Sequence, residues 1–125
     1  MKEITSKIIK EAEKDKEVLA VALFGSYARK EDYRDIDIAL VLKEKKSNKE
    51  MSKIKLKYAS KFDSKLDIHI FEQLPVYIKI RILKEGKFIL IKDEDKMYEI
   101  AFETIKEFGF YKKIYDSYLE NVKIR

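Results

Sequence analysis

The chain has no cysteine, one histidine, one proline and three glycines among its 125 residues. Without cysteine there can be no disulfide framework and no thiolate metal site, and a single histidine excludes a multi-histidine centre. A metal bound by this chain would therefore be held mainly by oxygen atoms, which favours Mg²⁺ or Mn²⁺.

Long apolar runs are also absent. The longest, residues 18–24, is far shorter than the roughly 20 residues of a membrane-spanning helix, and the opening segment MKEITSKIIKEAEKDKE lacks the apolar block of a signal peptide. Apolar residues make up 46% of the chain and charged residues 41%, which suits one hydrophobic core with a charged surface. We expect a single domain in the cytoplasm, with no membrane partner.

The positive charge is unevenly distributed. The formal net charge is +5, but residues 43–65 alone hold nine lysines against three acids. Such a segment could attract nucleic acid or a polyphosphate. It contains no arginine cluster and no interleaved aromatic platform, so we interpret it as the solvated face of a lysine-rich helix. Nucleic acid is a possible partner that the sequence does not favour.

The hydrophobic pattern predicts an α/β (α+β) fold, with a small mixed β-sheet, flanking helices and a C-terminal helical segment. Continuous or alternating apolar residues predict strands at residues 18–24, 35–42, 65–71 and 87–92. Helical periodicity predicts helices at residues 3–16, 27–30, 47–62 and 75–83, the third opened by a Ser47–Glu50 capping box. From residue 93 onward the sequence predicts helix, with a break or kink at Gly109.

Two aspartates stand at the beginning of the second expected strand. Alternation puts Asp35 and Asp37 on the same face of the strand, about 7 Å apart. Uncompensated carboxylates are costly in an otherwise apolar strand, so each needs a partner. A position at the strand end, or salt bridges with Arg29, Arg34 or a lysine, is one solution. The other is a divalent cation, on which two carboxylates mounted on a rigid strand can converge.

A turn precedes these aspartates, at the end of the first expected strand. Gly25 allows a ligand to approach the backbone closely, and the Ser26 hydroxyl with the N–H groups of a following helix suits a phosphate. Arg29 lies one turn into that helix, where it either reaches a triphosphate or is simply solvated. A phosphate cradle beside a carboxylate-held metal is the minimum for handling a nucleoside triphosphate.

A third aspartate, Asp67, lies inside the strand expected at residues 65–71. If this strand neighbours residues 35–42, Asp67 joins Asp35 and Asp37 at one site. Three acids can hold two Mg²⁺ ions, and Asp67 is then the natural general base. His69 shares the face of Asp67, but we interpret a lone strand histidine as structural.

These residues resemble a known family. The segment LFGSYARKEDYRDIDIALVL resembles the active-site signature of the polymerase-β-like nucleotidyltransferases, in particular the minimal nucleotidyltransferases of prokaryotes. LDIHIFEQLP resembles the strand that carries the family's third carboxylate, and IRILKEGKFIL its closing helix, turn and strand, so the resemblance covers roughly residues 15–92. It implies Mg²⁺ dependence and nucleoside monophosphate transfer with release of pyrophosphate. By position, Gly25 and Ser26 would bind the triphosphate, and the three aspartates the metal.

The C-terminal region carries a helical stripe of mostly apolar residues with 4,3 spacing, which are Met97, Ala101, Thr104, Phe108, Tyr111, Tyr115, Tyr118 and Val122. Such a stripe suits packing along another helix, and an exposed apolar patch commonly marks a protein interface. We therefore expect residues 1–92 to be the catalytic core and residues 93–125 a partner-binding segment. The alternative is that this helix packs on its own domain.

A tyrosine- and phenylalanine-bearing helical C-terminus resembles the MntA-like antitoxin branch of the family, whose members are paired with helical HEPN ribonuclease toxins. This resemblance implies transfer of AMP from ATP to a tyrosine of a HEPN-type toxin. Two alternatives stay open. One is a nucleotidyltransferase for a small molecule or an RNA end, and the other is a non-catalytic module that uses the same fold to bind a partner.

Overall fold

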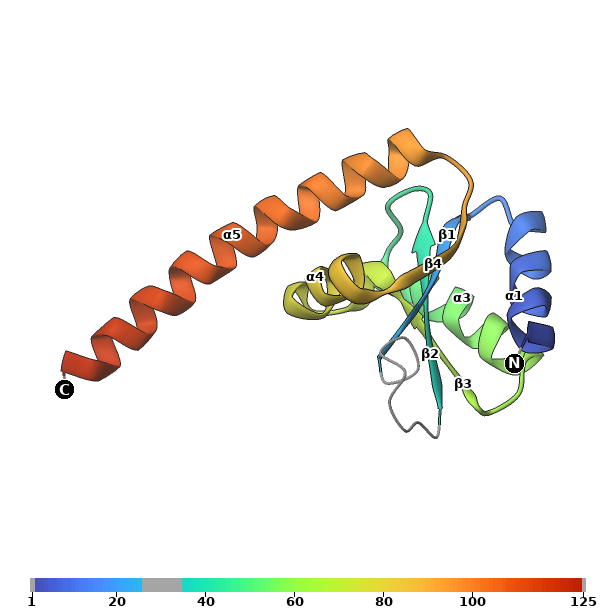
Figure 1. Ribbon diagram of the computed structural model, residues 1–125, viewed down its shortest axis with the longest axis horizontal. Helices are drawn as coiled ribbons and strands as arrows, with labels where there is room; N and C mark the ends of the chain where they lie inside the picture. The colour runs from blue at the N-terminus through green and yellow to red at the C-terminus, as the bar shows by residue number, and fades with distance from the viewer. Residues whose placement is uncertain (1, 26–34, 125) are drawn as a thin grey trace.

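The computed structural model describes residues 2–25 and 35–124 and contains one mixed β-sheet (Figure 1). Its strands are β1 (Val18–Phe24), β2 (Ile36–Leu42), β3 (Leu66–Ile70) and β4 (Lys87–Ile91), in the spatial order β3-β2-β1-β4. Strand β1 runs antiparallel to both β2 and β4, whereas β2 and β3 are parallel. The predicted α+β fold with a small mixed sheet is confirmed.

Four α-helices accompany the sheet in the described residues: α1 (Lys2–Lys14), α3 (Asn48–Lys61), α4 (Val76–Glu85) and α5 (Glu94–Ile124). A 3-10 turn, η1 (Phe71–Gln73), follows β3. The predicted capping box is present, since the Ser47 side chain accepts from the Glu50 N–H and the Glu50 carboxylate accepts from the Ser47 N–H. The short helix predicted at residues 27–30 lies outside the described residues.

The predicted break at Gly109 is wrong, because α5 is one continuous helix of 31 residues. A glycine inside a helix costs only about 1 kcal/mol relative to alanine, and its neighbours on both sides favour helix. Apart from its chain neighbours and the backbone of its own helical turns, no heavy atom of the described residues lies within 4 Å of the position that a Cβ would take at Gly109. The glycine is thus neither a hinge nor a packing contact here.

The sheet has a hydrophobic layer on each face. Ile36, Ile38 and Leu40 belong to the layer that includes residues of α1 and α3. Ala39 and Val41 belong to the layer that includes residues of η1, α4 and α5. Because side chains alternate along a strand, the odd-numbered positions of β2 face α4 and α5. Asp37 is one of these odd-numbered positions, so its side chain lies on the α4 and α5 face of the sheet.

Helix α5 packs on the domain only through its first half. Met97 and Thr104 are buried, whereas the part beyond Phe108 extends away from the sheet (Figure 1). There the exposed apolar side chains are Phe110, Tyr111, Ile114, Tyr115, Tyr118, Leu119 and Val122. Packing on its own domain thus holds for the first half of the helix, and partner binding by residues 93–125 stays a prediction. No helix within the described ranges is long and apolar enough to cross a membrane.

Candidate active site at the start of β2 and β3

Two carboxylates meet where β2 and β3 begin. The parallel register pairs Asp37 directly with Asp67, and neighbouring strands lie about 4.8 Å apart. Both side chains project from the face of the sheet on which α4 lies. The Asp37 side chain is 28% exposed and that of Asp67 is 52% exposed. The two acids are therefore adjacent to each other and accessible from solvent.

His69 completes the group. Its Nε2 atom lies 3.1 Å from Asp67 Oδ2 and 3.5 Å from Asp37 Oδ1. This nitrogen is buried, and neither of these two contacts has the geometry of a hydrogen bond. The pKa of His69 is raised above its ordinary value of 6.5, first by interaction with the Asp37 carboxylate and further by the Asp67 charge, while burial opposes the rise. The ring edge of Phe24 packs against the imidazole, with 5.4 Å between ring centroids.

Gly25 makes room for Asp37. Its φ angle is +75°, in the left-handed region that glycine adopts at little cost. A Cβ at this position would lie 2.2 Å from Asp37 Oδ2. Only a residue without a side chain can thus follow β1 directly while Asp37 keeps its position. The sequence predicted Gly25 as a close-approach position for a phosphate, and the structure adds a close approach to a carboxylate.

The structure brings together some of the predicted site residues. One ligand atom each from Asp37, Asp67 and His69 lies within 4.8 Å of the other two. Asp35 is exposed, stands just before β2 and is not part of this group. Ser26 and Arg29 lie outside the described residues. His69 was interpreted as structural, although its position two residues after Asp67 was a signal that both face the same way.

The donor set of this group fits a divalent cation. Carboxylate oxygens and a neutral imidazole nitrogen are both common ligands of such ions. A buried ring nitrogen without a hydrogen-bond partner, directed at two carboxylates, is an arrangement that a cation would complete. Asp37, Asp67 and His69 are thus the described residues that could hold a metal.

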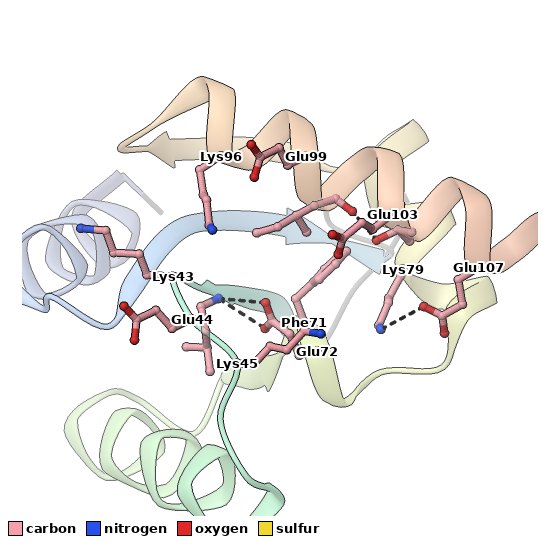
Figure 2. Close-up of a pocket in the computed structure, with 13 residues that line it drawn as sticks. Lys43, Glu44, Lys45, Phe71, Glu72, Lys79, Lys96, Glu99, Glu103 and Glu107 are labelled. Carbon is pink, nitrogen blue, oxygen red and sulfur yellow. Dashed lines mark hydrogen bonds and ion pairs between the residues drawn. The ribbon is translucent and has the colours of Figure 1, made fainter.

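A second hollow lies at the opposite end of β2. It is a cleft of about 500 Å³ between the end of β2, η1, α4 and α5 (Figure 2). Leu42, at its edge, is five positions beyond Asp37, about 17 Å along the strand. Its charged lining residues are Lys43, Glu44, Lys45, Glu72, Lys79, Lys96, Glu99, Glu103 and Glu107. The mixture of signs in this lining does not favour an anionic nucleotide.

Glu72 in this cleft titrates in an unusual range. Both of its carboxylate oxygens accept from the Leu42 N–H, at 3.2 and 3.3 Å (Figure 2). Burial raises the pKa of Glu72 from 4.5 to about 7. Because the folded state holds the proton more tightly than the unfolded state, this group's contribution to stability is greatest below pH 4.5 and falls as the pH rises to about 7.

Glu72→Gln is therefore expected to raise the free energy of unfolding by about 1–2 kcal/mol at pH 8 and to change it little at pH 4. Urea denaturation of both proteins at the two pH values measures this difference. The control is Glu99→Gln, an exposed residue of the same cleft, expected to change stability by less than about 0.5 kcal/mol. An equal effect of Glu72→Gln at both pH values would contradict the assignment.

Comparison with known proteins places this geometry in a family. The model of the polymerase beta nucleotidyltransferase family matches residues 6–95. A Methanocaldococcus jannaschii protein, provisionally named a protein adenylyltransferase, is 40% identical over 74 residues, which are 58% of this chain and 55% of that relative. The match thus spans about half of the curated relative's length.

Solved structures show the same fold. A chain of a toxin–antitoxin structure with AMP-PNP superposes with a TM-score of 0.72 at 24% identity, covering 94% of this chain and 96% of that one. A chain from the tri-AMPylated Shewanella oneidensis HEPN toxin in complex with MNT antitoxin gives 0.68 at 23% identity, covering 94% and 93%. Since the family model covers most of the chain and both carboxylates, this chain belongs to the polymerase beta nucleotidyltransferase family.

Proposed function

We propose that this chain transfers AMP from ATP to a tyrosine hydroxyl of a partner HEPN-type toxin and so acts as an antitoxin. The observation that carries the proposal is the register of β2 and β3, which sets Asp37 beside Asp67 on the family's fold. The name of the Methanocaldococcus jannaschii relative and the AMPylated toxin of the Shewanella oneidensis structure support the nature of the transferred group.

The proposed site residues form two groups, one that binds metal and one that binds the nucleotide. Asp37 and Asp67, with Asp35 at the start of the strand, would hold Mg²⁺, of which the sequence predicts two ions. Bound there, Mg²⁺ supplies charge neutralisation for the triphosphate and a lower pKa for the attacking hydroxyl. Gly25, Ser26 and Arg29 would bind the triphosphate. These assignments follow the family's pattern position by position.

The proposed reaction balances as a displacement at phosphorus. The acceptor oxygen forms a bond to the α-phosphorus of ATP, and the bond from that phosphorus to the bridging oxygen of pyrophosphate breaks. Asp67 takes the hydroxyl proton, and its half-exposed side chain is open to an acceptor from solvent. The bridging oxygen leaves as part of pyrophosphate and takes the electron pair of the broken bond. Asp37, on the neighbouring strand, has room for its carboxylate because residue 25 is a glycine.

The outer half of α5 supports a protein as the acceptor. Tyr111 and Tyr115 stack on each other with ring centroids 6.1 Å apart, and they continue through Tyr118 and Val122 as one exposed apolar stripe. The opposite side of the helix carries Gly109, Lys113, Asp116, Ser117 and Glu120. The outer half of α5 thus has one apolar side and one polar side, although it does not pack on its own domain. Such a helix suits binding to an apolar surface of a partner.

Tyr118→Asp is expected to weaken partner binding at least about tenfold, because it places a charge in the middle of the apolar stripe. Its side chain is 61% exposed, so the melting temperature should change little. Ser117→Asp introduces the same residue on the polar side and should leave binding unchanged. Calorimetric titration with the purified partner measures both. Equal affinities for the two variants would show that the stripe is not the contact surface.

Label transfer tests the proposed reaction. The chain is incubated with Mg²⁺ and ATP labelled at either the α- or the γ-phosphorus, together with a purified candidate HEPN-type partner. We expect α-label, and no γ-label, on a tyrosine of the partner. Label on RNA or on a small molecule without the partner would favour the first alternative. A complex that forms without binding Mg²⁺-ATP would favour the non-catalytic module. Either result would contradict the proposal.

A further inference from the structure

His69 is the one member of the candidate metal group that is not a carboxylate. Its side chain is 23% exposed, and its Nε2 atom is buried, directed at both carboxylates and without hydrogen-bond geometry to either. The aromatic contact with Phe24 holds the ring from another side. The imidazole is thus held with Nε2 facing the point where Asp37 and Asp67 converge.

The distances within the group suit ligands of one ion. Adjacent ligands lie about 3.0 Å apart around an octahedral ion with bonds of about 2.1 Å, and about 3.3 Å apart around a tetrahedral ion with bonds of about 2.0 Å. The His69 nitrogen lies 3.1 and 3.5 Å from the two carboxylate oxygens. These separations lie on either side of the tetrahedral value and slightly above the octahedral value, so the nitrogen could join the carboxylates without rearrangement of the strands.

We propose that His69 supplies a nitrogen ligand to this cation site and shifts its preference from Mg²⁺ toward divalent transition-metal ions such as Mn²⁺ and Zn²⁺. Mg²⁺ binds oxygen ligands almost exclusively, whereas imidazole adds affinity for transition metals. The inference concerns the metal site of the proposed transferase. It is nevertheless testable without nucleotide or acceptor, so its failure and that of the proposed function can be distinguished.

The composition of the chain makes the first test direct. His69 is the only histidine, so in a protein without a histidine tag every imidazole signal comes from this residue. In protein labelled with ¹⁵N-histidine, Zn²⁺ is expected to shift the Nε2 resonance selectively, and Mg²⁺ is expected not to. In pulsed electron paramagnetic resonance, bound Mn²⁺ should show nitrogen coupling that changes when ¹⁴N-histidine is replaced by ¹⁵N-histidine. Unchanged nitrogen signals with both ions would overturn the proposal.

Binding constants give the second test. His69→Gln is expected to weaken Mn²⁺ binding at least about tenfold and Mg²⁺ binding less than about threefold. Asp67→Asn is the matched variant and should weaken both ions at least about tenfold. Equal losses for both ions in His69→Gln, or no loss for either, would contradict a nitrogen ligand. If His69→Gln does not fold, the spectra of the unaltered protein decide the question.

Discussion

Asp37→Asn is expected to lower the rate of AMP transfer at least about 1,000-fold. A metal held in the active site supplies several kcal/mol of transition-state stabilisation, and about 4 kcal/mol corresponds to that factor. Asp37 is the carboxylate paired with Asp67 across the strands and seated against Gly25. An asparagine keeps the shape of the side chain but removes the charge that a cation needs. Initial rates with α-labelled ATP and the partner measure the loss.

Glu44→Gln is the control for this variant, since Glu44 is an exposed acid just beyond the other end of β2. It should keep at least half of the activity. The folded state of Asp37→Asn should be intact, because its neighbours Ile36 and Ile38 still fill the core. A fully active Asp37→Asn protein would show that the candidate site does not carry out the reaction.

Gly25→Ala is expected to damage both stability and activity. The left-handed φ of +75° costs an alanine about 1 kcal/mol, and the added Cβ would lie 2.2 Å from Asp37 Oδ2. The Asp37 side chain must then move, and a displacement of about 1 Å at a reacting centre can cost about 100-fold in rate. We expect a loss of about 1–3 kcal/mol in the free energy of unfolding, with a rate at least about 100-fold lower.

Gly109→Ala is the matched control. It makes the same substitution within helix α5, where the new Cβ would meet no other part of the described structure within 4 Å beyond its own helical turns. Because alanine favours helix, this variant should be more stable by about 0.5–1 kcal/mol and fully active. Chemical denaturation and transfer rates for both variants give the comparison. Similar behaviour of the two variants would show that Gly25 has no special role.

The sequence predicted the strands well because their periodicity is strong and local. Alternating apolar residues fixed which face of β3 carries Asp67 and His69. The pairing of Asp37 with Asp67 needed one further condition, that the two strands be neighbours, which no local pattern shows. The structure supplies that condition through the parallel register.

Other features depend on contacts between distant segments and were not predictable in detail. The contact of Gly25 with Asp37 exists only because β1 and β2 are antiparallel neighbours. The closeness of His69 to both carboxylates was not predictable, because an isolated histidine is ambiguous until its neighbours in space are known. Gly109 misled the prediction because the small cost of one glycine does not interrupt a long helix.

The central claim is that the group at Asp37 and Asp67 transfers AMP to a protein partner. Its most direct test is the intact mass of the partner purified after co-expression with either the unaltered chain or Asp37→Asn. The account predicts one or more adenylyl groups on partner tyrosines with the unaltered chain and an unmodified partner with the variant, in complexes of equal yield. A partner that is unmodified in both complexes, or modified in both, would contradict it.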